Sequence, residues 1–256
     1  MNILFIGDVV GSAGCRHLAK VLPSVKKQYA VDVCIVNGEN SADGNGITCV
    51  SAQTLFNAGA DAITTGNHVF RRPEVYELID QQTGVLRPAN YPDSAPGCGC
   101  FIVDKGRFRV AVINLLGVVY MEPLACPFET LNGLLDDPDL PPCRIVDFHA
   151  EATAEKKALA FFADGKVSAV LGTHTHVQTA DEPILPNGTG FISDAGMTGP
   201  ITSVLGIRPE LAVAKMRDKL PVRFVVADGN CMMNGVLLTV DPKSGRTTAI
   251  ERLDIR

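Results

Sequence analysis

Apolar runs of strand length alternate along this chain with amphipathic stretches of helix length. Runs rich in β-branched residues predict buried strands, and stretches that begin at proline or end at glycine predict helices. The predicted strands are 2–6, 31–36, 60–65, 109–117, 144–149, 167–172, 188–193, 223–228, 235–240 and 247–253. The predicted helices run through Leu22 after the first strand, over 74–80 behind Pro73, over 151–165, and from Pro209 to Leu220. This alternation is typical of an α/β fold.

The predicted strands at the C-terminal end are joined by short turns, which indicates antiparallel pairing and therefore a mixed sheet. We expect an α/β protein built as a layered, mixed β-sheet sandwich flanked by helices. The length is compatible with a single domain over 1–256. Proline-rich loops around 87–100 and 118–143 are candidates for a small cap.

Composition limits the kind of partner that the surface can bind. The chain is 46% hydrophobic with a formal net charge of −5, which argues against binding of long nucleic acid through phosphate neutralisation. No apolar run approaches the roughly 20 residues of a membrane helix. The segment MNILFIGDVV has an aspartate within its short apolar stretch, so we expect a first strand and no signal peptide.

Eight cysteines are scattered along the chain, at positions 15, 34, 49, 98, 100, 126, 143 and 231. Without a secretory leader, reduced thiols in a cytoplasmic protein are expected. The pair at 98 and 100 fits neither the zinc-ribbon nor the CxxC redox spacing. The cysteines therefore predict no thiol chemistry.

The sequence THTH, residues 173–176, places two of the chain's five histidines just after the apolar run 167–172. If this stretch stays extended, His174 and His176 point to the same side. Two imidazoles there can serve a pair of metal ions, which lie roughly 3.5–4 Å apart in two-metal sites. A loop with two solvated histidines is the alternative that this segment alone leaves open.

Polar side chains also follow other predicted strands, at the ends where open α/β sheets place their ligands. Each has a structural alternative: Asp8 as a turn residue, Glu39 as a solvated charge, or His149 as a core histidine bonded to the backbone. The repetition at five strands favours one shared site. Its candidate residues are Asp8, Glu39, Asn40, Asn67, His68, His149, His174 and His176.

The glycine-rich segment GDVVGSAG at 7–14 suggests a competing site, a nucleotide-phosphate loop before a helix. It lacks the Lys-Ser/Thr pair of a P-loop and does not match GxGxxG. A helix N-terminus could still help to hold a phosphate.

The order of these motifs resembles a known family. GD near the N-terminus, GEN at 38–40, GNH at 66–68, a lone downstream histidine and GTHTH at 172–176 resemble the calcineurin-like metallophosphoesterases. The blocks TTGNHVF, LRPANYP, DFHAEATAEK, GTHTHVQTADE and SDAGMTG are similar to the YmdB-like branch over essentially the whole chain. The resemblance implies a metallophosphoesterase-like fold and hydrolysis of 2′,3′-cyclic nucleotides, or similar small phosphodiesters, to nucleoside monophosphates.

The resemblance also implies two groups of metal ligands that share a bridging Glu39. The first group is Asp8, Glu39, Asn40 and His176, and the second is Glu39, Asn67, His149 and His174. The wider superfamily opens with DxH, whereas Val10 stands here, so Asn40 is the candidate replacement. The bridging residue is glutamate where the wider superfamily commonly has aspartate. These departures leave the geometry of the first group least defined.

Two cations suit this reaction because they neutralise phosphoryl oxygens and depress the pKa of a bound water. We expect a metal-bridging hydroxide to attack phosphorus in line. His68 follows ligand Asn67 and is the candidate to protonate the leaving oxygen or to steady the phosphate; an extra ligand or a plain turn histidine is its alternative. Carboxylate, amide and imidazole ligands favour iron, manganese or zinc over copper or calcium. The resemblance favours iron or manganese, with zinc as the third option.

Three further expectations concern the surroundings of the site. Arg71, with its neighbour Arg72, could contact a base or phosphate, although both also fit as solvated charges at a helix start. A homo-oligomer is expected; the apolar segment GVVYM at 117–121 fits an interface or the core. A regulatory protein that binds nucleotide with little turnover, motivated by the proline-rich loops, and a phosphomonoesterase with the same ligands are the alternative functions.

Overall fold

The computed structural model describes residues 1–81 and 83–256. Its helices are α1 Gly11–Gln28, α2 Cys49–Ala58, η1 Val69–Arg71 (a 3₁₀ turn), α3 Val75–Asp80, α4 Pro127–Leu135, α5 Thr153–Phe162 and α6 Pro209–Asp218. Its strands are β1 Asn2–Ile6, β2 Asp8–Val9, β3 Val33–Asn37, β4 Ala62–Thr64, β5 Cys100–Asp104, β6 Arg109–Leu116, β7 Cys143–His149, β8 Ala169–Thr173, β9 Gly190–Ile192, β10 Met197–Pro200, β11 Cys231–Val240 and β12 Thr247–Ile255.

These strands form two mixed sheets. The larger follows the order β2-β10-β11-β1-β3-β4, with β12 paired to β11, and the other follows the order β5-β6-β7-β8-β9. In the larger sheet β1, β3 and β4 run parallel, while β11 is antiparallel to β1 and to β12. The antiparallel pairing expected of the C-terminal strands is therefore confirmed for β11 and β12.

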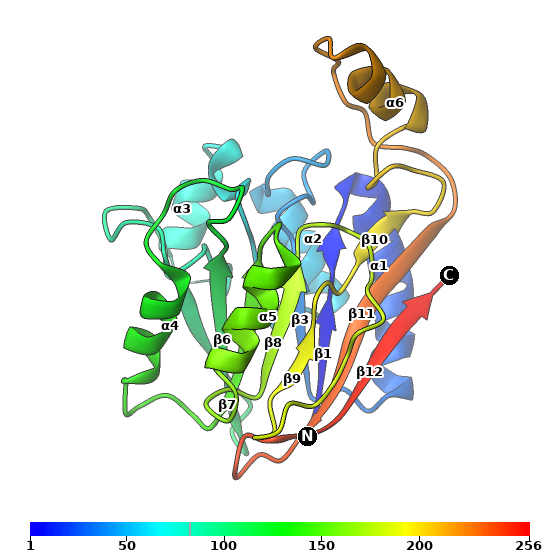
Figure 1. Cartoon of the computed structure of the whole chain (residues 1–256). Coiled ribbons are helices and arrows are strands. Elements are labelled where there is room, and N and C mark those ends of the chain that lie inside the picture. The colour runs from blue at the N-terminus through cyan, green and yellow to red at the C-terminus, as the bar shows by residue number, and fades with distance from the viewer. Residues whose placement is uncertain (82) are drawn as a thin grey trace.

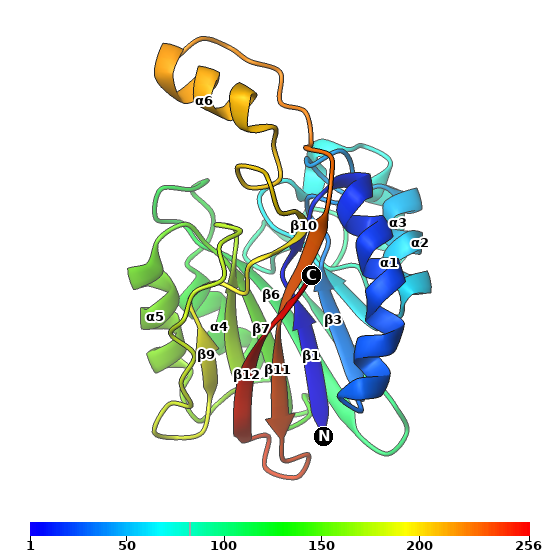
Figure 2. The ribbon, with the colours of Figure 1, turned by 90° about the vertical axis from the view of Figure 1, so that its right-hand side faces the viewer.

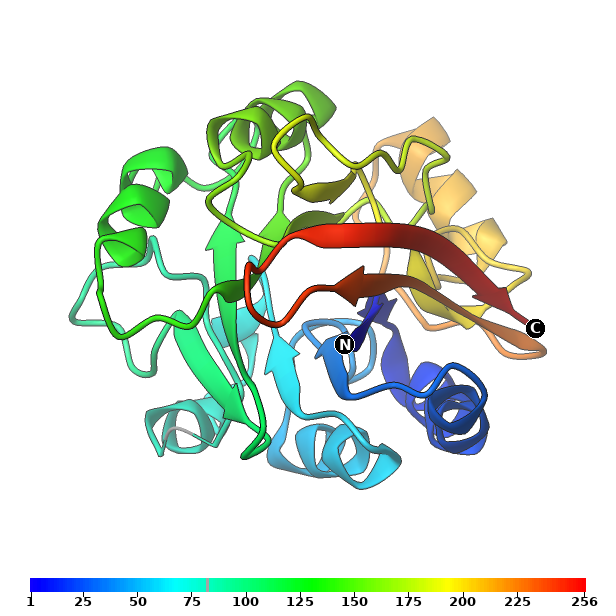
Figure 3. The ribbon, with the colours of Figure 1, turned by 90° about the horizontal axis from the view of Figure 1, so that it is seen from below.

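The two sheets face each other, and helices cover their outer sides (Figure 3). Phe5 and Ile35 of the larger sheet belong to the same buried cluster as Val112 and Leu171 of the other. A second cluster packs α1, α2 and α3 against the larger sheet, and a third packs α4 and α5 against the other. The layered, mixed β-sheet sandwich expected from the sequence is confirmed.

The strands that matter for function all finish at one end of the sandwich. β1, β3 and β8 point toward the upper end in Figure 1, and parallel pairing brings the ends of β4 and β7 to the same region. Close approach between β8 and the segment after β9 requires Gly172, because a Cβ atom there would lie 1.9 Å from the Ser193 carbonyl oxygen. Side chains placed just after these strands therefore gather within one space.

Two sequence expectations about local structure were wrong. Helix α1 continues past Leu22 to Gln28 and includes Pro23, because Leu18, Leu22 and Val25 extend one apolar stripe onto the core. The run 223–228 is no strand; only Val226 forms an isolated bridge, to Ile207. A β-branched composition favours a strand only where a tertiary neighbour pairs with it, and here that pairing is limited to Val226.

The expected strands and helices otherwise exist, with shorter bounds in several cases. The helix expected over 151–165 ends at Phe162, although Gly165 does adopt the left-handed conformation, with φ 84°. Helix α2, helix α4, and the strands β2, β5 and β10 were not anticipated. Because α4 occupies 127–135, the segment 118–143 is not a loop throughout.

Helix α6 stands away from both sheets, at the end of an arm that leaves the upper end of the sandwich (Figures 1 and 2). We define the arm as residues 201–230. Ala212 is the only residue of α6 among the described residues that is buried. Among the described residues, none of the helices has both the length and the apolar character that crossing a bilayer requires.

Candidate metal centre

The eight polar residues expected to share a site do converge. They lie at strand ends of both sheets: Asp8 begins β2 directly after β1, Glu39 and Asn40 follow β3, Asn67 and His68 follow β4, His149 ends β7, and His174 and His176 follow β8. Distances of 3.0–3.9 Å join their side chains into one cluster. Their placement thus agrees with a single site at the strand ends.

The inner part of the cluster is made of Glu39, His149 and His174. His149 Nε2 lies 3.1 Å from Glu39 Oε1, 3.1 Å from His174 Nδ1 and 3.1 Å from Asn67 Oδ1. One ligand atom from each of Glu39, His149 and His174 lies within 4.8 Å of the others, as coordination of one metal ion requires. These three residues, with Asn67 beside them, could hold a cation.

A second group surrounds Asp8 on the other side of Glu39. His176 Nε2 lies 3.7 Å from Asp8 Oδ1 and 3.1 Å from Asn40 Nδ2. Asn40 Nδ2 also donates to Glu39 Oε1 at 3.1 Å. Glu39 therefore lies between the two groups.

The histidine pair does not continue the extended conformation of β8, in which the two side chains would point to the same side. His174 has φ 103° and His176 has φ 63°, so the chain turns sharply through this segment. Consequently the two rings diverge, one toward His149 and the other toward Asn40. Asp194 fixes the turn, since it accepts hydrogen bonds from Thr175 N at 3.0 Å and Thr175 Oγ1 at 2.8 Å.

The carboxylate that fixes this turn is itself paired with a buried lysine. Lys156 Nζ of α5 lies 3.0 Å from Asp194 Oδ2, and the side chains are 0% and 1% exposed. Such a pair is strongly unfavourable to break, because the remaining charge stays buried without a partner. This ion pair could not be predicted from the sequence, because a lysine in an amphipathic helix is expected on the surface.

A second unpredicted network orients His149. Its Nδ1 lies 2.9 Å from Thr173 Oγ1, and that hydroxyl donates to Asp147 Oδ1 at 2.7 Å. Because the Thr173 hydroxyl proton is committed to Asp147, its oxygen accepts the Nδ1 proton of the ring. Asn37 Nδ2 donates to Asp147 Oδ2 at 2.9 Å, and the Thr64 hydroxyl donates to it as well. The hydrogen bond at Nδ1 orients the His149 ring so that Nε2 faces the cluster, as the partners of metal-ligating histidines do in many metal sites.

Electrostatics in the cluster favour added positive charge. Burial alone would lower the pKa of His149, but the buried carboxylates, Glu39 foremost, outweigh this effect and raise it to about 9. Burial and the charge of His149 lower the pKa of His174 to about 3. Burial raises the pKa of Asp8. The carboxylates thus stabilise one positive charge on an imidazole, and a divalent cation would supply that charge in its place.

Two further observations fit a metal at this position. The buried atom Asp8 Oδ1 has no hydrogen-bond partner, which is unfavourable for a carboxylate that no cation neutralises. A Cβ atom at Gly66 would lie 2.3 Å from Glu39 Oε2 and 2.4 Å from His149 Nε2. Only glycine therefore leaves space beside these two side chains. Carboxylate, amide and imidazole donors together suit a transition-metal dication.

A cavity of about 660 Å³ opens onto the cluster. His68 lies on its wall with Nδ1 3.0 Å from Asn40 Oδ1 and 3.2 Å from Glu39 Oε1. Arg72 lines the cavity, whereas Arg71 is not among its lining residues, so a substrate contact by Arg71 stays a prediction. Two arm residues that the sequence did not indicate, Arg223 and Phe224, complete the wall.

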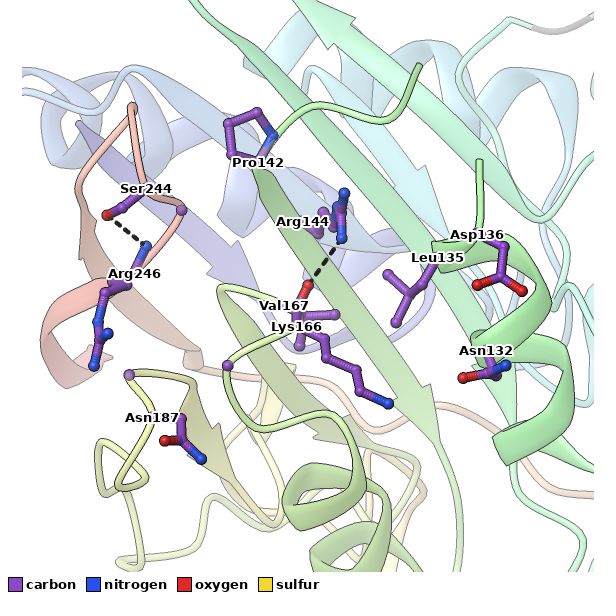
Figure 4. Close-up of a pocket in the computed structure, with 13 residues that line it drawn as sticks. Asn132, Leu135, Asp136, Pro142, Arg144, Lys166, Val167, Asn187, Ser244 and Arg246 are labelled. Carbon is purple, nitrogen blue, oxygen red and sulfur yellow. Dashed lines mark hydrogen bonds between the residues drawn. The ribbon is translucent and has the colours of Figure 1, made fainter. Parts of the chain in front are cut away.

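Another cavity, of about 400 Å³, lies at the opposite ends of β7 and β8 (Figure 4). Arg144 is held there by the Lys166 carbonyl at 3.1 Å, and Arg246 lies on the β11–β12 turn. None of the residues expected to form the site lines this cavity. Its lining residues include three cationic side chains, Arg144, Lys166 and Arg246, and one carboxylate, Asp136, but no histidine or cysteine that could join Asp136 as a metal ligand.

The sandwich, with its cluster of ligand-type side chains at the strand ends, has the metallophosphoesterase fold. A solved structure assigned as a 5′-nucleotidase of Staphylococcus aureus has this fold, with a TM-score of 0.62 and 16% sequence identity over 100% of this chain and 54% of that one. A sequence profile of the YmdB-like protein family matches residues 4–253. The chain therefore belongs to the YmdB-like family, and it is an enzyme of the phosphoester hydrolase class.

Relatives within this family match almost end to end. A 2′,3′-cyclic-nucleotide 2′-phosphodiesterase of Bacillus subtilis is 44% identical over 254 residues, covering 99% of this chain and 96% of the relative. The solved structure of a novel phosphatase from Mycoplasma pneumoniae superposes with a TM-score of 0.94 at 34% identity, covering 100% of this chain and 93% of that one.

The buried pair behind the histidine turn yields a test by stability. Lys156→Met should lower the free energy of unfolding by about 3–5 kcal/mol, because the Asp194 carboxylate loses its buried counter-charge. Urea denaturation measures the loss. Lys157→Met is the matched control, since Lys157 is exposed on the same helix, and it should change stability by no more than about 0.5 kcal/mol. Equal stability of the two variants would contradict this role for the pair.

Proposed function

We propose that this protein is a binuclear, metal-dependent phosphodiesterase that converts 2′,3′-cyclic nucleotides, or similar small phosphodiesters, to nucleoside monophosphates. The observation that carries the proposal is the position of Glu39 between two groups of ligand-type side chains. The name of the Bacillus subtilis relative, 44% identical over nearly the whole chain, supports the diester substrate.

In this proposal each group would hold one ion, and Glu39 would contribute to both groups. The first ion is assigned to Asp8, Glu39, Asn40 and His176, and the second to Glu39, Asn67, His149 and His174. Iron or manganese is proposed, with zinc as the third option, because the donors are oxygen and nitrogen atoms. When bound, the two cations would neutralise phosphoryl oxygens and make a coordinated water more acidic.

The protein's own residues position the substrate and handle its protons. We assign to His68 the transfer of a proton to the leaving ribose oxygen, because its ring lies on the cavity wall and contacts Asn40 and Glu39. Histidine side chains gain and lose protons near neutral pH, as a general acid requires. A contact between Arg71 and the substrate is retained as a secondary proposal.

A phosphomonoesterase with the same ligands is the second candidate, because the similar Mycoplasma pneumoniae structure is called a phosphatase. A regulatory nucleotide-binding protein with low turnover is the third; it would need the proline-rich loops for a partner. Those loops contact each other where the Ala125 amide donates to the Asn90 carbonyl at 3.3 Å. We propose that the loops 87–100 and 118–143 form a cap within one domain that spans the chain.

The cellular setting is also a proposal. We place the enzyme in the cytoplasm, acting on a small substrate and neither on long nucleic acid nor at a membrane. All eight cysteines are free thiols, as a reducing compartment allows. The net charge of −5 fits a small anion held by metals better than a polymer held by a basic groove.

We further propose that the enzyme is a homo-oligomer joined through α6. Its exposed face presents Val213, 53% exposed, and Met216, 64% exposed, with Leu220 just beyond. Glu210 lies in the first turn and Lys215 in the last, where Arg217 is already paired with Asp218. Two antiparallel copies of α6 would therefore bring Glu210 of one copy near Lys215 of the other, at both ends of an apolar centre.

Metal dependence is the first test. The protein loaded with Mn²⁺ or Fe²⁺ should hydrolyse 2′,3′-cyclic AMP, and chelation should abolish turnover. His149→Ala and Asn67→Ala should each lose metal in elemental analysis and at least about 100-fold in kcat/KM. Full activity in both variants, with the fold intact by circular dichroism, would reject the ligand assignment.

The same preparation separates the diesterase from the monoesterase. Bis(p-nitrophenyl) phosphate should be cleaved faster than p-nitrophenyl phosphate under identical metal loading. The reverse preference would favour the phosphomonoesterase.

His68 is tested by separating rate from binding. His68→Ala should lower kcat about 10²- to 10⁴-fold, as loss of a general acid does, while the inhibition constant of a non-hydrolysable cyclic nucleotide analogue and the metal content stay near those of the wild type. A regulatory protein would show little rate in either form. Loss of bound metal from the variant would instead identify His68 as a ligand.

Oligomerisation is tested by mass in solution. Light scattering at micromolar concentration should give a multiple of 27.2 kDa, and Met216→Asp should reduce the mass to that of one chain, because a carboxylate would be buried at the centre of the interface. A wild-type protein that is monomeric at this concentration would contradict the proposal.

A further inference from the structure

The arm defined above contributes several residues to the wall of the metal-site cavity. Leu205, Ile207, Arg223 and Phe224 line the same cavity as His68 and His176. Its root is directly attached to the cluster, because the Leu205 carbonyl oxygen lies 3.0 Å from His176 Nδ1. The arm and the metal centre therefore enclose one space.

The segments where the chain enters and leaves the arm, 206–208 and 225–227, are hydrogen-bonded to each other. Arg208 N donates to the Val225 carbonyl at 3.0 Å, and Ala227 N donates to the Gly206 carbonyl at 2.8 Å. Val226 also packs against Gly44, outside the arm: a Cβ atom added at Gly44 would lie 3.1 Å from Val226 Cγ2. Phe224 adjoins this bonded segment, so its location is fixed even though α6 projects outward.

Phe224 is unusual among the cavity residues because it is aromatic and half exposed, at 50%. A single exposed apolar side chain needs no explanation by itself. The position of Phe224 is informative, because an aromatic ring beside a site for an anionic phosphodiester offers a surface on which a nucleobase can stack. Bases stack on aromatic side chains largely irrespective of their identity.

Arg223 adds a positive charge next to that face. Among the described residues, no carboxylate lies within ion-pair distance of Arg223, whereas Arg72 across the same cavity is 3.7 Å from Asp43. An unpaired guanidinium attracts any anionic substrate, with or without a base.

We propose that Phe224 is the stacking platform for the nucleobase of the substrate and that Arg223 draws the substrate's negative charge into the cavity. This inference rests on the proposed phosphodiesterase function and deepens it. It makes the arm the element that distinguishes a nucleotide from a base-free cyclic phosphate. Little selectivity among bases is expected, because Phe224 would contact the base only by stacking.

The experiment compares two substrates that share a five-membered cyclic phosphate, 2′,3′-cyclic AMP and glycerol 1,2-cyclic phosphate, on the manganese-loaded enzyme. Phe224→Ala should lower the ratio of kcat/KM for 2′,3′-cyclic AMP to kcat/KM for glycerol 1,2-cyclic phosphate about 5- to 100-fold, mainly by raising KM for the nucleotide. Arg223→Gln should raise KM for both substrates by a similar factor, and added salt should reduce this effect.

Phe161→Ala is the matched control, because Phe161 is 55% exposed on α5 and does not line the cavity; its substrate ratio should equal that of the wild type. An unchanged ratio in Phe224→Ala would overturn the inference, as would an equal loss on both substrates, which would indicate a structural or oligomeric role. A wild-type enzyme that hydrolyses neither substrate would instead reject the proposed function.

Discussion

Two carboxylates, Asp8 and Glu39, are buried at 0% and 1% exposure among imidazole rings. Like charges in such a place are costly unless a cation neutralises them. Much of the surrounding architecture follows from this constraint. Strands from both sheets must end together to deliver the ligands, and glycine must stand at 66 so that no Cβ atom fills the space between Glu39 and His149.

Orientation of the ligands depends on a second layer of buried polar residues. Asp147 and Thr173 determine the direction of the His149 ring, and Lys156 with Asp194 determines the turn that separates His174 from its neighbour. Each of these groups is buried and hydrogen-bonded, as the polar groups of a network that rigidifies a site must be. The sandwich thus stabilises a precise constellation with charges that would be unfavourable anywhere else in its core.

The sequence allowed much of this to be predicted. The carboxyl ends of parallel strands lie at one edge of a sheet, so periodicity and punctuation placed Asp8, Glu39 and His149 at strand ends. Their assignment as metal ligands came from the family resemblance. The turn at the histidine pair did not, because it depends on Asp194, which is remote in sequence. The run 223–228 has the composition of a strand, but only a tertiary neighbour decides whether it pairs. For the same reason, Phe224 could not be associated with the site before the path of the arm was known.

The contact at the root of the arm has a consequence for how this site can evolve. The Leu205 carbonyl can only accept a hydrogen bond, so it fixes the proton of the His176 ring on Nδ1 and leaves the lone pair of Nε2 facing the carboxylates. Because that acceptor belongs to the main chain, replacing the side chain at this position does not remove it. Position 205 has φ 54°, so asparagine or glycine would occupy it with less strain than leucine. The tautomer of the histidine is therefore insulated from point mutation at the residue that selects it.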